Sequence, residues 1–133
     1  MENQNKVNVQ VKKELKKPDK IIGEEGNQAK MYISKFPDGR QVSRIEIDAG
    51  FDWKKSIKPL LPNCPDWCPA SHFGYLEEGE MIVEMENGSK QTVSAGDAYY
   101  VPPGHIPIIN KHTVMIEFSQ DTTYTNKKFI NKN

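Results

Sequence analysis

Apolar and polar residues alternate in short runs through the middle of the chain, and turn residues separate these runs. Residues 81–85 alternate in this way, and Asn87-Gly88 then supplies the residues of a tight type I′ turn before 89–94 returns antiparallel. Residues 113–119 alternate as well. About eight to ten short strands at close spacing, with almost no helical periodicity, predict an all-β sandwich or barrel.

The earlier part of this region follows the same pattern. Runs 29–34 and 40–48 flank a Pro-Asp-Gly turn at 37–39, which predicts a hairpin. Residues 51–59 place two aromatic side chains on one face, as an extended segment does. Residues 60–71 are dense in proline, which lacks a backbone donor, so we expect an irregular loop there.

The two ends of the chain differ from its middle. Residues 1–25 are polar and rich in lysine and asparagine, and we expect a flexible N-terminal arm. Residues 121–133 are expected to form a similar C-terminal tail. The 133 residues are typical of one compact domain, which we place at 26–120 as a β-barrel.

Charge and hydropathy exclude several partners. Eighteen basic and eighteen acidic residues cancel, so the whole chain has no electrostatic reason to bind nucleic acid or a membrane. The lysines of the arm have no interleaved aromatic residues for base stacking. The first residues lack the apolar segment of a secretory signal, and no apolar run approaches the roughly 20 residues of a membrane helix. We therefore expect a cytoplasmic protein, in which two cysteines do not indicate a disulfide framework.

Glycines and a proline late in the chain form a specific pattern. Gly96 is followed, five residues later, by Pro102 and then Gly104, and Gly79 lies one short hairpin upstream. This G-x5-P-x-G pattern, with its upstream glycine, resembles the conserved motifs of the cupin superfamily, and the resemblance extends over residues 40–119. It implies a double-stranded β-helix, that is, a jelly-roll barrel.

The resemblance also aligns the family's metal-ligand positions with residues other than the usual three histidines and one glutamate. The histidine positions of the first motif hold Asp66 and Cys68, its glutamate position holds His72, and the histidine position of the second motif holds Pro107. His105 lies two residues before Pro107 and hence on the same face of an extended strand. The resulting pattern, C-x3-H-x-G-Y followed by P-P-G-H, resembles a variant branch of the cupins.

Cys68, His72 and His105 are therefore the candidate ligands of one divalent transition metal. A thiolate and two imidazoles suit zinc, and also nickel, copper or iron, and three protein ligands leave one position open. Asp66 or Cys64 could close the site instead and make it structural. The alternative is a metal-free wall in which Cys68 is a buried apolar residue and the histidines are hydrogen-bonded.

The cysteines allow two further interpretations. Cys64 and Cys68 are separated by three residues, so a reversible disulfide remains open, although thioredoxin-type motifs have two. His72 could instead activate the thiolate of Cys68 as a nucleophile, but the sequence identifies no oxyanion hole. His112 falls beside Lys111 in an apparent turn, and we expect it to be exposed.

Aromatic side chains at the barrel mouth could bind a small polar or aromatic molecule. The alternative role of each is packing in the core or at a dimer contact. The four candidates are Trp53, Trp67, Tyr75 and Tyr99. The resemblance further implies a homodimer, with a contribution from the N-terminal segment that contains Ile21, Ile22 and Met31.

Three classes of function remain open at this point. The first is binding of a small molecule in the barrel, with or without a divalent metal as the contact. The second is a metal-dependent enzyme, such as a dioxygenase, isomerase or lyase, for which the sequence assigns no catalytic residue. The third is a metal-free sensor or accessory binding module.

Overall fold

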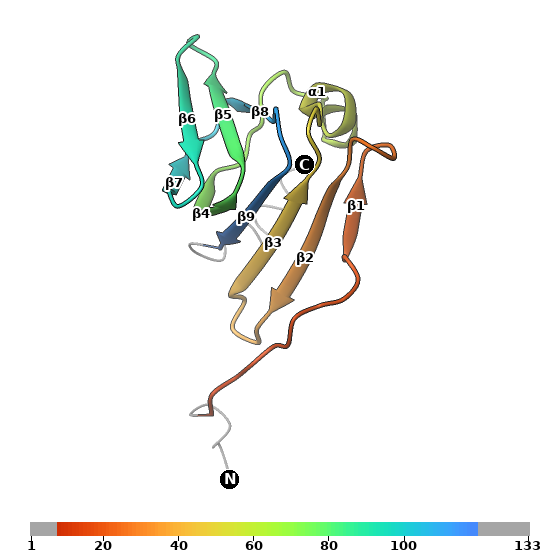
Figure 1. Cartoon of the computed structure of the whole chain (residues 1–133), viewed down its shortest axis with the longest axis vertical. Helices are drawn as coiled ribbons and strands as arrows, with labels where there is room; N and C mark the ends of the chain where they lie inside the picture. The colour runs from red at the N-terminus through yellow and green to blue at the C-terminus, as the bar shows by residue number, and fades with distance from the viewer. Residues whose placement is uncertain (1–7, 120–133) are drawn as a thin grey trace.

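Two antiparallel sheets make up the computed structural model, which describes residues 8–119 (Figure 1). The larger sheet contains, in spatial order, β1 (Lys20–Ile22), β2 (Ala29–Lys35), β3 (Gln41–Ile47), β9 (Thr113–Phe118), β4 (His72–Glu78) and β7 (Ala98–Val101). The smaller sheet contains β6 (Lys90–Ser94), β5 (Glu80–Met85) and β8 (His105–Ile108). The all-β prediction is therefore confirmed.

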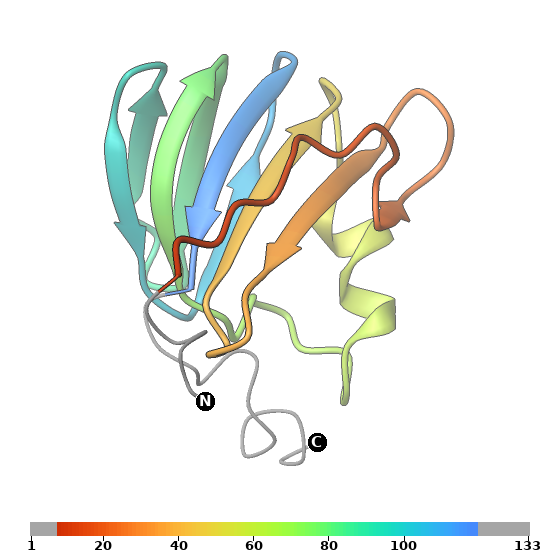
Figure 2. The same ribbon diagram turned by 90° about the horizontal axis from the view of Figure 1, so that it is seen from below.

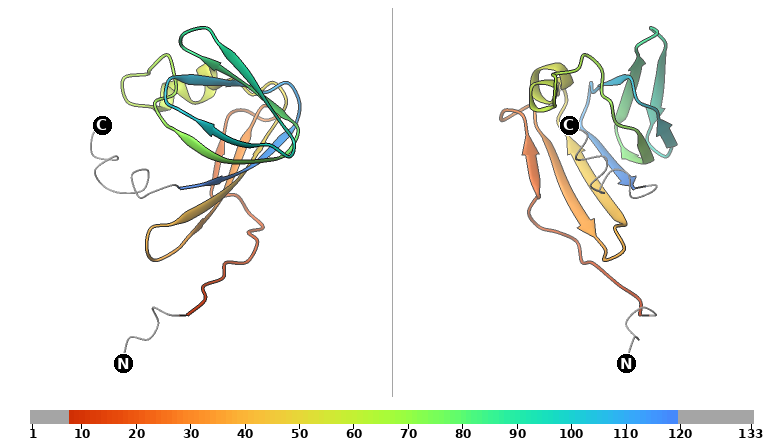
Figure 3. Two further views of the ribbon diagram at one scale, coloured as in Figure 1. Left: turned by 90° about the vertical axis from the view of Figure 1, so that its left-hand side faces the viewer. Right: turned by 180° about the vertical axis from the view of Figure 1, so that it is seen from behind.

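A single main core lies between the two sheets, which Figure 3 shows from the side and from behind. It takes Ile45, Leu76 and Met115 from the larger sheet and Met81 and Val83 from the smaller one. Burying each side chain of this kind stabilises the fold by roughly 1.5–3 kcal/mol. The inward face of each strand alternates with an outward face, as the sequence pattern predicts.

Gly79 lies where the chain leaves β4 in the larger sheet and enters β5 in the smaller one. Its φ of +89° lies in the left-handed region, and a Cβ atom there would come within 2.3 Å of the carbonyl oxygen of His112. Only glycine fits both requirements. The upstream glycine of the sequence motif therefore has a clear structural role at this corner.

The β5–β6 hairpin forms where the alternation predicts it, but the type of its turn was predicted wrongly. A type I′ turn needs positive φ at both Asn87 and Gly88, and Gly88 alone has it (+92°). The amide of Gly88 donates to the carbonyl of Met85 at 2.8 Å, and the amide of Ser89 donates to Oδ1 of Asn87 at 2.9 Å. The side chain of Asn87 thus stabilises a three-residue loop with Gly88 in the left-handed region.

The segment 51–59 is not extended, contrary to the sequence prediction. Trp53–Ser56 form the short helix α1, and Lys58–Leu60 form a 3₁₀ turn. Asp52 caps the helix, because its Oδ1 atom accepts a hydrogen bond from the amide of Lys55 at 3.2 Å. The helix buries Trp53 at the end of the barrel interior.

The N-terminal segment runs across the outer face of the larger sheet, as Figure 2 shows. Part of the predicted arm is strand, because Lys20–Ile22 pair with β2 as β1. The predicted C-terminal tail, 121–133, lies outside the described residues. Within residues 8–119, no helix is both long enough and apolar enough to span a membrane.

Candidate functional site

The structure brings together the side chains of Cys68, His72 and His105, the three residues predicted as metal ligands. Their sulfur and ring nitrogen atoms all lie within 4.8 Å of one another. Cys68 and His105 are buried (8% and 3% exposed), and His72 is half-buried. The three come from the loop before β4, the start of β4 and the start of β8.

Backbone hydrogen bonds hold the loop of Cys68 against the start of β8. The amide of Cys68 donates to the carbonyl of His105, and the amide of Gly104 donates to the carbonyl of Cys68, each at 2.8 Å. Gly104 has a φ of +92°, which lets the Pro-Pro-Gly turn bend the chain sharply into β8. The prolines and glycine of the second motif therefore set the position of two candidate ligands at once.

A carboxylate that the sequence reasoning missed orients His72. The Nδ1 atom of His72 lies 2.9 Å from Oε1 of Glu117, and the hydroxyl of Tyr99 donates to Oε2 of Glu117 at 2.8 Å. With Nδ1 of His72 bonded to a carboxylate, its Nε2 atom faces Sγ of Cys68 at 4.0 Å. The available signal was the inward position of Glu117 on a strand whose other face is apolar.

His105 is oriented in a similar way by the backbone. Its Nδ1 atom lies 2.7 Å from the carbonyl oxygen of Pro102 and donates a hydrogen bond to it, which leaves Nε2 as the nitrogen that a metal could bind. The rings of His72 and His105 pack edge to face, with centroids 5.0 Å apart. Acceptors on the Nδ1 atoms are the arrangement that holds imidazoles for metal binding through Nε2.

The same contacts shift the acidity of two groups in the site. Burial raises the pKa of the Cys68 thiol, but hydrogen bonds to His105 and His72 outweigh it and bring the pKa down to about 6. Burial lowers the pKa of His72, but its bonds to Cys68 and Glu117 outweigh it and raise the pKa to about 10. Without a metal, Cys68 and His72 thus form a thiolate–imidazolium pair at neutral pH.

Tyr99 stays protonated in this network. Burial raises the pKa of its hydroxyl, and the neighbouring negative charge of Glu117 raises it further. The hydroxyl is therefore a permanent donor to Glu117. Gly74 makes room for Tyr99 beside Glu117. A Cβ atom at position 74 would lie 3.0 Å from the Tyr99 hydroxyl oxygen and 2.2 Å from the carbonyl oxygen of Ile116.

The three candidate ligands line a cavity of about 460 Å³ inside the barrel. Apolar side chains form most of its wall, among them Ile33, Ile45, Met81 and Met115. Pro107, which occupies the family's histidine position, lines the same cavity as His105. The prediction that these two positions share one strand face is therefore confirmed.

The four aromatic residues predicted to bind a ligand do not come together. Trp53 lines the cavity and is 2% exposed, and Trp67 packs against the small apolar cluster that contains Trp53, apart from the main core. Tyr75 points outward from β4 and is 45% exposed. Tyr99 is buried against Glu117. These positions leave Trp53 as the member of the set that a cavity ligand would touch.

The remaining candidates lie outside the cluster. Asp66 is exposed and forms an ion pair with Lys58 at 2.7 Å, which lowers the pKa of the carboxyl group. Cys64 is an exposed free thiol, and Cys68 is a buried free thiol. His112 is exposed, as expected. Neither Asp66 nor Cys64 completes the site as a fourth ligand among the described residues.

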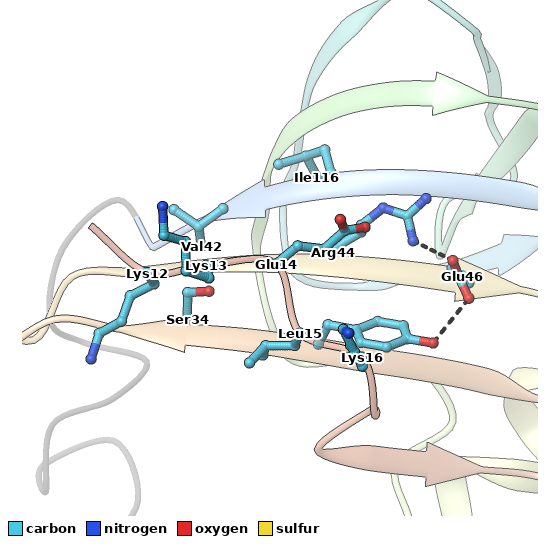
Figure 4. A pocket seen from close by; sticks show the side chains of 11 residues that line it. Lys12, Lys13, Glu14, Leu15, Lys16, Ser34, Val42, Arg44, Glu46 and Ile116 are labelled. Carbon is cyan, nitrogen blue, oxygen red and sulfur yellow. Dashed lines mark hydrogen bonds and ion pairs between the residues drawn. The ribbon is translucent and has the colours of Figure 1, made fainter.

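A second cavity, of about 570 Å³, lies between the N-terminal segment and the outer face of the larger sheet (Figure 4). There Glu46 bonds to Arg44 and accepts a hydrogen bond from the hydroxyl of Tyr32 at 3.3 Å. The bond to Arg44 lowers the pKa of Glu46 despite its burial. Because these charges already satisfy one another, the barrel cavity is the stronger candidate site.

Comparison with known families identifies the same region of the chain. A family model described as a cupin domain matches residues 66–122, which include all three candidate ligands. A comparison with curated proteins found no match.

Solved structures agree on the fold. A cupin-like protein from Thermotoga maritima is 10% identical, with a TM-score of 0.55 over 91% of this chain and 96% of that one. The EutQ protein of Clostridium difficile is 13% identical, with a TM-score of 0.52 over 72% of this chain and 70% of that one. A Neisseria meningitidis protein is 17% identical, with a TM-score of 0.50 over 69% and 83%. The expected jelly-roll fold is confirmed.

Proposed function

Since this chain belongs to the cupin superfamily, we propose that its barrel holds a divalent transition metal through Cys68, His72 and His105 and presents it to a small molecule in the cavity. The observation that carries the proposal is the convergence of one sulfur and two imidazoles within 4.8 Å at the wall of an internal cavity.

The chemistry of the donor set fits this role. A thiolate with two neutral imidazoles is a good ligand set for zinc and also accepts nickel or iron. The lowered pKa of Cys68, to about 6, supplies the thiolate at neutral pH. Three protein ligands leave a coordination position for a ligand or water, and a metal there would act as a Lewis acid toward a bound oxygen or nitrogen atom.

Metal content of the purified protein tests the proposal. We expect about one equivalent of metal by elemental analysis of wild type prepared without chelator, and a loss of it in Cys68→Ser and His72→Ala. Cys64→Ser and His112→Ala are matched controls, because both residues are exposed and outside the cluster. Equal metal content in all five preparations would remove the proposal.

The homodimer is a further part of the proposal, although its predicted contact needs revision. Ile22 and Met31 line the interior cavity, and Ile21, at 53% exposed, is the one of the three that faces outward. Aromatic residues on the outer faces of three neighbouring strands support a contact with a second copy, since exposed apolar patches of this kind mark interfaces. They are Phe73, Tyr75, Tyr100 and Phe118, each between 43% and 57% exposed, of which Phe73 and Phe118 also line the cavity.

Light scattering tests the dimer. The wild type should have twice the chain mass of 15.2 kDa, and Tyr100→Glu should shift the protein toward the monomer. Glu84→Gln on the smaller sheet is the control and should stay dimeric. A monomeric wild type at 100 μM would contradict this part of the proposal.

A further inference from the structure

Hydrocarbon side chains form most of the wall of the cavity behind the three candidate ligands. Ile33, Ile45, Ile47, Val83 and Met115 line it from four different strands. Its volume of about 460 Å³ lies in the range of small-molecule sites. A sugar or a phosphate would lose its water here without gaining replacement hydrogen bonds, which is costly. The wall therefore favours an apolar body.

Few full charges lie on the cavity wall. Apart from the candidate ligands, the charged side chains that line the cavity are Lys20 and Glu117. Both oxygens of Glu117 are bonded, one to His72 and one to Tyr99. Lys20 is exposed on β1, the edge strand of the larger sheet, which three strands separate from β4. No cluster of cations is present among these lining residues to bind a phosphate or a multiply charged acid.

Ser43 is a polar exception on this wall. It lines the cavity at 7% exposure, and its hydroxyl has no hydrogen-bond partner within residues 8–119. A buried hydroxyl without a hydrogen bond is unfavourable, so a ligand atom that bonds to it recovers free energy. Ser43 is therefore an anchoring point that the fold leaves open to a ligand.

The sheet register puts this hydroxyl at the polar end of the cavity. Ser43 lies opposite Glu117 in the β3–β9 pair, and Glu117 in turn bonds to His72. Two residues further along, Ile45 lies opposite Met115, where the wall is apolar. A ligand that matches this wall has its polar atoms together at one end.

We infer that the ligand is an amphipathic molecule with a hydrocarbon body, a single metal-binding head group and a hydrogen-bonding atom next to that head group. This inference rests on the proposed metal function. The head group lies at Cys68, His72 and His105, the adjacent polar atom lies at Ser43, and the hydrocarbon body fills the space along Ile45 and Met115. This differs from the polar or aromatic ligand that the four aromatic residues suggested.

Straight-chain hydroxamates test the inference, because they keep one chelating head group while the hydrocarbon body grows. With zinc-loaded protein, calorimetry from acetohydroxamate to octanohydroxamate should show roughly fourfold tighter binding per added methylene, until the cavity is full. Gluconohydroxamate, with a polyol body, should bind no tighter than acetohydroxamate. No gain with chain length, or tighter binding of the polyol, overturns the inference.

Two variants on neighbouring strands distinguish ligand binding in the cavity from ligand binding at the surface. Ile33→Asn changes a lining residue of β2, and Val42→Asn changes an outward residue of β3. Ile33→Asn should weaken octanohydroxamate at least tenfold and leave acetohydroxamate unchanged, whereas Val42→Asn should leave both unchanged. Thermal melts confirm that each variant folds. Equal effects of the two variants on octanohydroxamate overturn the inference.

A second binding experiment, without metal, distinguishes this inference from the proposed function. The alcohols from butanol to octanol should displace 1-anilinonaphthalene-8-sulfonate from chelator-treated protein, with affinity rising along the series. A rise here without any metal binding upholds the apolar cavity and removes the metal proposal. Metal binding with no dependence on chain length in either series upholds the metal proposal and overturns the inference.

Discussion

The Nδ1 atom of His72 lies 2.9 Å from Oε1 of Glu117, a residue 45 positions later in the chain. This contact links the start of β4 to the end of β9 across adjacent strands of the larger sheet. A carboxylate on Nδ1 fixes the ring orientation and increases the basicity of Nε2, the nitrogen that faces Cys68. Glu117 is thus a positioning residue for the proposed metal site.

Glu117→Gln should weaken metal binding about 10- to 100-fold, as loss of a carboxylate behind a histidine ligand does. The amide keeps the shape of the side chain but cannot hold a full negative charge beside His72. Competition with a chromophoric chelator gives the dissociation constants. Glu77→Gln, on the outward face of the same sheet, is the control. Unchanged affinity in Glu117→Gln would show that Glu117 has no role in the site.

Metal binding should release about one proton from the Cys68–His72 pair at pH 7.5. At that pH the thiol, with its pKa of about 6, is already ionised, and His72, with its pKa of about 10, still holds the proton that the metal must displace. Because of the protons on Cys68 and His72, the affinity for metal should rise about tenfold per pH unit between pH about 6 and about 10. Below that range it should rise more steeply. Calorimetry in buffers of different ionisation enthalpy measures the proton count, and zero release contradicts the assignment.

The rate of alkylation of Cys68 should depend on the ionisation of its thiol beside His72. In Cys64→Ser, iodoacetamide should modify Cys68 with a half-maximal rate near pH 6, because its thiolate is stabilised by His105 and His72. One equivalent of zinc should suppress the reaction. In Cys68→Ser, the exposed Cys64 should react equally with and without zinc. A half-maximal rate near the ordinary thiol value of about 8.5, measured by mass spectrometry, would be the contrary result.

Gly74→Ala should destabilise the fold and disturb the site together. Its Cβ atom would lie 2.2 Å from the carbonyl oxygen of Ile116 and 3.0 Å from the hydroxyl of Tyr99. Forcing β4 away from β9 should lower the free energy of unfolding by about 1–3 kcal/mol or more. Urea unfolding measures this, with Glu77→Ala, at an exposed position of the same strand, as control. A stability equal to wild type would contradict the close approach of the two strands.

Local features of the fold were predictable where they depend on neighbours in the sequence. The alternation in 81–85 and 113–119 predicts β5 and β9, because successive side chains of a strand point to opposite faces. The same reasoning failed at 51–59, where two aromatic residues two positions apart suggested a strand and Asp52 instead caps a helical turn. A pattern of two residues is too short to separate the two periods.

The candidate site was predictable in part, and the limit lies in strand pairing. Cys68, His72 and His105 could be named as candidates because their positions relate to glycines and prolines nearby in the chain. The partners of these residues could not be identified: Glu117 and Ser43 join the site because β9 lies between β3 and β4.

The amino-acid sequence by itself determined that the chain forms short antiparallel strands, and where its corners lie, because backbone periodicity and left-handed turns depend on a few adjacent residues. The tertiary structure alone decided which inward side chains share a row, and hence that His72 is bonded to Glu117, that Tyr75 faces outward and that hydrocarbon side chains form most of the cavity wall. The order of strands in a sheet depends on the burial of the whole core, which no local pattern records.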